Sequence, residues 1–296
     1  MRPLERGRVT FAVTVRLARG FVLAAVLTAG LMASASAHAH DGAIRWRTLV
    51  TAHTRVHYPA RLKTFAQRVA ETAEEALLTL RPLFRYVPPR RIELTIDDYS
   101  DDANGFAGAF PFDHVHIQAW PPLPGSDLAD NGDWIRALVF HEVAHILHIG
   151  DASGVSTLIN GVMGRTWLPN QFLPRFWIEG LAVHVETRYP GRDKAVRGKT
   201  PSKSQGGRDE AAPYMALLRG ALRDGTWPSL AQLTGPPLAW PRGRGWYVFG
   251  SWLLDYQARA HGHSKLKRFI HGYGGRVVPY GINLLYRQIY GRSALA

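Results

Sequence analysis

Three histidines and one glutamate interrupt an otherwise apolar run, "FHEVAHILH" (residues 140–148). His141 and His145 are four positions apart, so on a helix both imidazoles lie on one face, one turn from each other. Glu142 lies beside them. This arrangement is typical of metallopeptidases, in which two histidines hold zinc and the glutamate acts on the water that the metal activates. The spacing therefore predicts a zinc site with Glu142 as general base.

The pattern is short enough to arise by chance. Its flanks, "ALVF" and "VAHIL", are apolar, however. Burying two imidazoles and a carboxylate in such surroundings is costly unless each group has a partner. A metal ion would satisfy all three groups, which favours a metal site.

Catalytic zinc takes three protein ligands and leaves its fourth position to water, so two histidines are one ligand short. The candidate is Glu179 in "WIEGLAVHVE", 34 residues after His145, near the start of a second apolar segment. A glutamate in the first turn of a helix is also favoured by the helix dipole alone. From the residues, both explanations of Glu179 stay open.

Together these segments resemble the gluzincin metallopeptidases, the clan of thermolysin and the aminopeptidases. The resemblance runs from about Ala43 to the end and is strongest at "FHEVAHILH", "FWIEGLAVHVE" and "WPRGRGWYVFGSWLLDY". Within the clan, the sequence is most similar to a bacterial branch of exported, peptidase-MA-like proteins. The resemblance implies a zincin-like fold and one Zn2+ ion held by His141, His145 and Glu179.

The resemblance extends to one more candidate. Gluzincin aminopeptidases carry a Y-x-x-G motif whose tyrosine hydroxyl supports the oxyanion of the transition state. Here "YVFG" places that tyrosine at Tyr247, 68 residues after Glu179. The alternative is an aromatic residue of the core, since Trp246, Phe249 and Trp252 surround it.

Two features depart from the family pattern. The G-x-M-E-N type strand that holds a free amino terminus in aminopeptidases is absent, which favours an endopeptidase over an aminopeptidase. Val183 stands where thermolysin has an aspartate, four residues after the ligand glutamate. We therefore expect a different partner for the metal ligands.

The first 37 residues predict a signal peptide. An arginine-rich start precedes a short apolar core (Phe21–Met32), and small residues follow up to a cut before His38. The apolar core is shorter than the roughly 20 residues that span a bilayer, which favours cleavage over a retained anchor. We expect an exported bacterial protein, periplasmic or extracellular, with a mature chain of residues 38–296.

Composition narrows the function further. The absence of cysteine excludes disulfides, thiolate metal sites and a cysteine nucleophile. The formal net charge is +13, and removing the five arginines and one glutamate of residues 1–37 leaves +9. The densest basic run, Gly191–Arg208, lacks the interleaved aromatics that stack on bases. We expect a peptide or protein substrate, no nucleic acid, and no membrane span after the signal.

The order of the predicted elements gives the fold class. Residues 43–59 predict one or two strands, residues 61–84 a helix, and "RIELTIDD" and "HVHIQAW" two further strands joined by a Gly- and Asp-rich connection. From Asp133 onward the pattern is helical. This predicts an α+β fold, with a small mixed sheet and the active-site helix in residues 38–150 and a mostly helical part in residues 151–296.

Two further histidines are weaker candidates. His148 follows His141 by seven residues, so it shares that face and could orient a ligand; a partly exposed residue at the helix end is the favoured explanation. His184 follows Glu179 by five residues and does not share its face well.

The predicted strand around His114 and His116 could line the cleft, although exposed strand histidines explain both residues. The acidic stretch Asp97–Asp102 could suggest calcium, but it lacks the EF-hand spacing, which favours a polar turn.

Two other functions remain open from the sequence. One is a catalytically idle gluzincin scaffold that binds an envelope partner, and the other is a zinc hydrolase of a non-peptide substrate. The retained Glu142 argues against the idle scaffold, which has no need for a base.

Overall fold

The structure is a computed structural model, and it describes residues 43–129, 132–189, 207–235, 240–277 and 281–293. The chain divides into two units, residues 1–44 and residues 45–296. The predicted signal peptide and most of the basic run Gly191–Arg208 lie outside the described residues. Within the described residues, no helix is long and apolar enough to cross a membrane.

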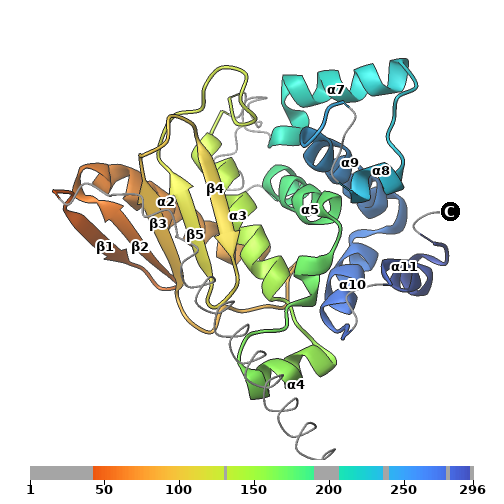
Figure 1. Ribbon diagram of the computed structural model, residues 1–296, viewed down its shortest axis with the longest axis horizontal. Helices are drawn as coiled ribbons and strands as arrows, with labels where there is room; N and C mark the ends of the chain where they lie inside the picture. The colour runs from red at the N-terminus through yellow and green to blue at the C-terminus, as the bar shows by residue number, and fades with distance from the viewer. Residues whose placement is uncertain (1–42, 130–131, 190–206, 236–239, 278–280, 294–296) are drawn as a thin grey trace, which may run out of the picture. The chain divides into compact units, whose positions relative to one another are not determined.

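The strands of residues 46–118, at the start of the second unit, form one five-stranded mixed sheet (Figure 1). Its strands are β1 (Trp46–Val50), β2 (Thr54–Pro59), β3 (Ile92–Asp97), β4 (Asn104–Gly108) and β5 (His114–Gln118). The order is β1-β2-β3-β5-β4, in which β2, β3 and β5 are parallel and the outer strands β1 and β4 are antiparallel to their neighbours. β4 is therefore an edge strand.

The helix α2 (Lys63–Leu80) makes the crossover that the parallel pair β2 and β3 requires. Its buried residues recur at helical spacing, and they include Val69, Ala73, Leu77 and Leu80. This face packs against β2 and against the helix α3 (Trp134–Gly150). The helix predicted over residues 61–84 is thereby confirmed.

The strand β4 was not predicted, because its sequence "NGFAG" looks like a connection. Glycine is needed here for a close approach: a Cβ at Gly105 would lie 2.9 Å from the side chain of Glu142. A glycine inside a strand often marks such an approach. β4 therefore lies directly against α3, as Figure 1 shows.

From α3 onward the chain is mostly helical, which confirms the α+β fold. Asp133 begins α3 by accepting a hydrogen bond from the backbone N–H of Arg136. The helices that follow are α4 (Gly154–Met163), α5 (Arg175–Arg188), α7 (Ala212–Arg223), α8 (Leu230–Thr234), α9 (Arg244–His261), α10 (His263–Gly274) and α11 (Ile282–Tyr290). Short 3-10 turns lie at Ala60–Leu62, Pro169–Phe172 and Arg208–Glu210.

Two glycines allow α5 and α9 to pack with their backbones in contact. A Cβ at Gly180 would lie 2.4 Å from the carbonyl carbon of Gly250, and a Cβ at Gly250 would lie 2.2 Å from the carbonyl oxygen of Phe176. No larger residue fits at either position. Glu179 and Tyr247, each close in sequence to one of these glycines, are thereby brought to the same side of the molecule.

Candidate metal centre

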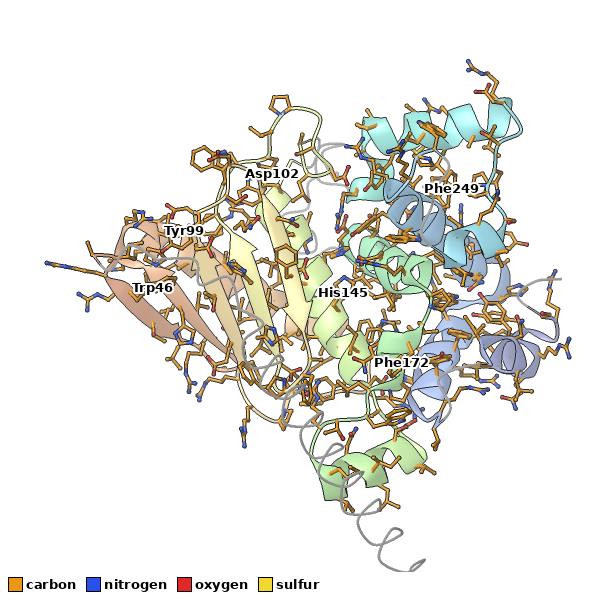
Figure 2. The ribbon with its side chains drawn as sticks, viewed as in Figure 1. Trp46, Tyr99, Asp102, His145, Phe172 and Phe249 are labelled. Carbon is orange, nitrogen blue, oxygen red and sulfur yellow. The ribbon has the colours of Figure 1, made fainter. Side chains whose placement is uncertain are left out.

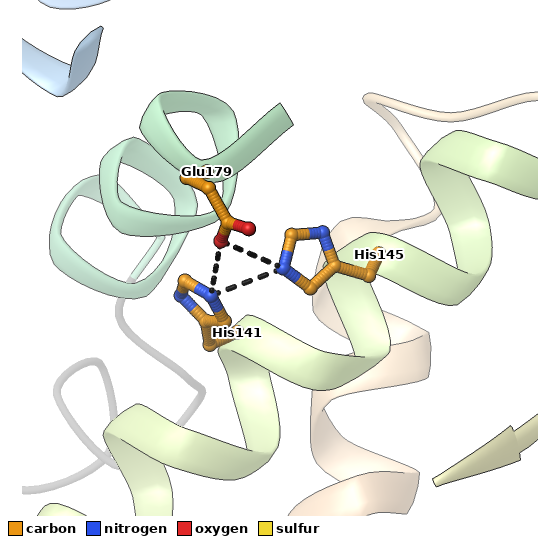
Figure 3. A group of neighbouring side chains, drawn as sticks. All are labelled: His141, His145 and Glu179. Carbon is orange, nitrogen blue, oxygen red and sulfur yellow. Dashed lines mark hydrogen bonds and ion pairs between the residues drawn. The ribbon is translucent and has the colours of Figure 1, made fainter. Parts of the chain in front are cut away.

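Three buried side chains converge where α3 faces α5 (Figure 3). The Nε2 atoms of His141 and His145 are 3.1 Å apart. The Oε2 atom of Glu179 lies 3.4 Å from the first and 3.3 Å from the second. The structure thus brings together the three residues that the sequence and the resemblance proposed as ligands.

The spacing of these atoms fits a zinc ion. Ligand bonds of about 2.0–2.1 Å at tetrahedral angles place neighbouring ligand atoms about 3.3–3.4 Å apart. The three separations of 3.1, 3.4 and 3.3 Å match the edges of one face of such a tetrahedron. Burial opposes ionisation of Glu179, yet hydrogen bonds and charge from the two imidazoles hold its pKa well below the usual range. The site therefore offers two imidazole nitrogens and one anionic oxygen.

A second carboxylate, Glu186 of α5, contacts the ring of His141 from the opposite side. Its Oε2 lies 3.1 Å from Nδ1 of His141, the nitrogen that faces away from the other ligands. When Nε2 binds metal, Nδ1 carries the proton and donates it to Glu186, which fixes the tautomer and the ring. Glu186 thus supplies the partner that Val183 cannot.

Arg208 keeps Glu186 charged. Its Nε donates to Oε1 of Glu186 at 2.9 Å, its Nη2 to Oε2 at 2.9 Å, and its backbone N–H to Oε1 at 2.9 Å. Although burial opposes ionisation, this guanidinium and His141 lower the pKa of Glu186 to about 2. Nη2 also lies 2.5 Å from Nδ1 of His141; because a guanidinium only donates, this contact needs the lone pair of Nδ1, whereas the contact with Glu186 needs a proton on Nδ1.

Glu142 lies beside the ligands at the base of a cleft of about 540 Å³. β4, α3, α5 and the start of α9 line this cleft, and Figure 2 shows His145 where the sheet and the helical half meet. Burial raises the pKa of Glu142 to about 7, with the charge of His145 opposing the shift. Its carboxyl group can therefore take up and release a proton near neutral pH.

Tyr247 reaches the same cleft from α9. Its ring stacks on that of His141, with centroids 6.0 Å apart and planes at 25°. Burial, and then the charge of Glu179, raise the pKa of Tyr247 above its ordinary value, so the hydroxyl keeps its proton. Tyr247 also packs against the core; the core and the cleft explanations both hold for this residue.

The remaining histidines of these two helices lie outside the metal group. His148 is 1% exposed and His184 is 0% exposed, and the ring nitrogens of both have no hydrogen-bond partner. Burial lowers the pKa of His148 to about 3 and that of His184 to about 4. The expectation that His148 is partly exposed at the helix end is wrong.

The strand expected to line the cleft is also different. His114 and His116 lie on β5, which is covered at its edge by β4, and it is β4 that lines the cleft. His116 bonds to Asp97 instead. The acidic stretch Asp97–Asp102 forms no metal group; within the described residues, His141, His145 and Glu179 are the only such group.

No known protein family matches the sequence, and neither does any curated protein. Among solved structures, the chain is similar to two crystal structures of a mutant M1 zinc metallopeptidase from Deinococcus radiodurans, one of them bound to a Tyr-Ser-Ala substrate. Both are 14% identical, with TM-scores of 0.47 and 0.42, and both alignments cover 85% of this chain. The chain spans 50% of the length of those structures.

Proposed function

We propose that this chain is a zinc-dependent peptidase of the gluzincin type, in which His141, His145 and Glu179 hold one zinc ion. The convergence of three buried donors at tetrahedral spacing carries this proposal. A cleft opens onto the group, and the carboxyl of Glu142 lies at its base. A scaffold without activity would need neither that carboxyl nor a cleft in contact with it.

Each residue has a chemical role in this proposal. Zinc, when bound, polarises the scissile carbonyl and acidifies water. Glu142 accepts the proton of the attacking water and passes it to the leaving amine. Tyr247 donates a hydrogen bond to the carbonyl oxygen as it becomes negative, a contact commonly worth about 3 kcal/mol. Glu186 holds the ring of His141 in place.

The edge of β4 suits a peptide substrate. One side of β4 pairs with β5, and no described strand pairs with its other side. Residues 102–107 line the cleft. An extended peptide can add to such an edge through backbone hydrogen bonds, which hold it beside the metal group irrespective of its sequence. This favours cleavage within a chain, in line with the missing amino-terminal clamp.

We further propose that the enzyme acts outside the cytoplasm of a bacterium, in the periplasm or beyond. The support is the signal-like start of the sequence. The substrate is then a peptide or protein of that compartment, with no role for nucleic acid.

The test is elemental analysis of zinc in purified residues 38–296, followed by digestion of a mixed peptide library. We expect about one zinc per chain, weaker retention in Glu179→Ala, and cleavage by the wild type. Zinc without cleavage would favour the idle scaffold or a non-peptide hydrolase. A folded wild-type chain that holds no zinc would contradict the proposal.

A further inference from the structure

The helix α4 carries its apolar side chains on the outside of the molecule. Val155, Leu158, Val162 and Met163 are exposed, and Leu158 and Val162 reach 68% and 81%. The first three recur at spacings of three and four residues and Met163 lies beside them, so the four form one stripe along the helix. A surface helix of a globular protein normally directs its apolar stripe to the core. Packing of the core therefore does not explain the stripe of α4.

Hydrogen bonds of the polar side of α4 fix this orientation. Ser156 is buried and donates to the carbonyl oxygen of Arg276 at 3.2 Å. The side chain of Asn160 donates to the carbonyl oxygen of Trp167 at 2.7 Å, and it accepts from the backbone N–H groups of Thr166 and Trp167 at 3.1 and 2.7 Å. α4 packs extensively against no other described helix or strand, and Figure 1 shows it apart from the other labelled elements. The outward stripe is thus a fixed feature of the fold.

The chain around α4 is positively charged. Residues 152–178 contain two arginines and no acidic residue. Asp151, which precedes this segment, is buried and bonded to His271. Arg165, which follows α4, borders a hollow of about 890 Å³ whose lining carries three more arginines, Arg55, Arg90 and Arg91. The two carboxylates in that lining are each paired with an arginine of the same lining. The surface next to the apolar stripe therefore suits an anionic partner.

We infer that α4 binds the surface of an anionic phospholipid bilayer, with its apolar stripe among the acyl chains and the neighbouring arginines at the headgroups. An exposed apolar stripe next to basic side chains is the arrangement of helices that lie in a membrane interface. The ten residues of α4 rise about 15 Å, half of a hydrocarbon core of about 30 Å, so the helix reaches into one leaflet only. Trp167 and Phe172 follow α4 with their ring centroids 5.8 Å apart, and tryptophan favours such an interface.

A second copy of the chain is a poorer occupant of this surface. A stable dimer buries at least about 1,000 Å², and a stripe of four side chains supplies only part of it. Each predicted mature chain carries a net charge of +9, so two copies repel each other, whereas the same charge attracts the chain to anionic lipid. The inference goes beyond the proposed function and does not depend on it, because α4 contributes no residue to the lining of the metal cleft.

The test is flotation of residues 38–296 with phosphatidylcholine vesicles, with and without phosphatidylglycerol. The apolar start of the sequence is left out, because such a segment binds lipid by itself. We expect the wild type to float with the anionic vesicles, and Leu158→Gln combined with Val162→Gln to lower the partition coefficient by about tenfold or more. The matched control, Leu222→Gln combined with Leu284→Gln, changes two exposed leucines (67% and 55%) on α7 and α11 and should bind as the wild type does.

A dye places the contact on α4. Because the chain has no cysteine, an environment-sensitive dye attached to Val162→Cys reports on one position. Its emission should shift to shorter wavelength when anionic vesicles are added, and the emission of the same dye on Leu222→Cys should not.

Four results would overturn the inference: a wild type that does not float, binding that survives Leu158→Gln with Val162→Gln, equal binding to phosphatidylcholine alone, and an unshifted dye on Val162→Cys. A dimer in sedimentation velocity that Leu158→Gln with Val162→Gln abolishes, without flotation of the wild type, would assign α4 to a second copy instead. Absence of zinc or of peptide cleavage would contradict the proposed function and leave the flotation result unaffected.

Discussion

Four buried histidines lie on α3 and α5, and they form two pairs that differ in their contacts. His141 and His145 are 3% and 9% exposed, and their Nε2 atoms converge on Glu179. His148 and His184 are 1% and 0% exposed, and their ring nitrogens have no hydrogen-bond partner. Burial of a histidine is thus not a sign of metal binding. The convergence of several donors on one point is.

The carboxylates explain the difference between the two sets. Glu179 and Glu186 lie seven residues apart, two turns along one face of α5, and both point at His141. The face that carries His184 offers no such partner. Burial therefore keeps His184 neutral, whereas a carboxylate on each side of His141 prepares it to hold a cation.

The largest expected effect is on turnover, and it comes from a substitution of Glu142, which lies beside the proposed metal ligands. If Glu142 serves as both base and acid, as we propose, Glu142→Gln should lower kcat by about 10⁴ and leave zinc content unchanged. Steady-state kinetics and elemental analysis check both. His148→Gln, on the same helix, is the matched control and should keep kcat within about threefold. Retained turnover in Glu142→Gln would remove it as the base.

Tyr247→Phe should have the next largest effect, a fall in kcat of about 10² at unchanged KM, if the hydroxyl acts only in the transition state, as we propose. The substitution keeps the ring that stacks on His141. Tyr290→Phe, on α11, is the control. A rise in KM alone would show that the hydroxyl of Tyr247 binds substrate and does not stabilise the oxyanion.

Site residues that are close together in the sequence were easier to predict than those that are far apart in it. His141, Glu142 and His145 need only the geometry of one helix turn, so their placement followed from spacing. Glu179 reaches the histidines through the packing of α5 against α3, and Tyr247 joins them through the contact between Gly180 and Gly250, 70 residues apart. Residue spacing has no information on such contacts: the missing third ligand suggested Glu179 and left the helix-dipole explanation open, and the resemblance to a family then favoured Glu179 and supplied Tyr247.

Three features were missed: Glu186, Arg208 and the strand β4. Glu186 could have been found, since it follows Glu179 by seven residues on the same helical face. Arg208 follows Glu186 by 22 residues, after a segment without periodicity, so no local pattern indicates it. β4 was missed because its two glycines resemble a turn, although one of them, Gly105, permits the close approach to Glu142. The glycine that lets β4 pack closely against α3 is also the residue type that makes its sequence look like a connection.

A smaller effect tests the carboxylate behind His141. Glu186→Gln keeps the shape of the side chain but removes the charge that polarises the ring. We expect zinc affinity to fall by roughly 10- to 100-fold, as measured by competition with a coloured chelator. His148→Gln should leave the affinity unchanged. An effect of His148→Gln as large as that of Glu186→Gln would contradict the distinction between the two sets of histidines.

The smallest expected effect is on folding stability at acid pH, and it comes from His184, whose ring nitrogens have no hydrogen-bond partner. The pKa of His184 in the folded chain is about 4, below its ordinary value of 6.5, because burial disfavours the cation. The unfolded chain therefore binds a proton first as the pH falls. The stability is complete above about pH 6.5 and declines as the pH falls towards 4. At pH 5.5 the loss from this residue should be about 1 kcal/mol.

Urea unfolding of the metal-free protein at pH 7.5 and 5.5, for wild type and His184→Leu, measures this loss of stability. The variant should lose less stability between the two pH values, because other titrating groups are common to both chains. Equal losses would mean that His184 is protonated inside the fold and that a charge which favours the cation, such as that of Asp255, stabilises it.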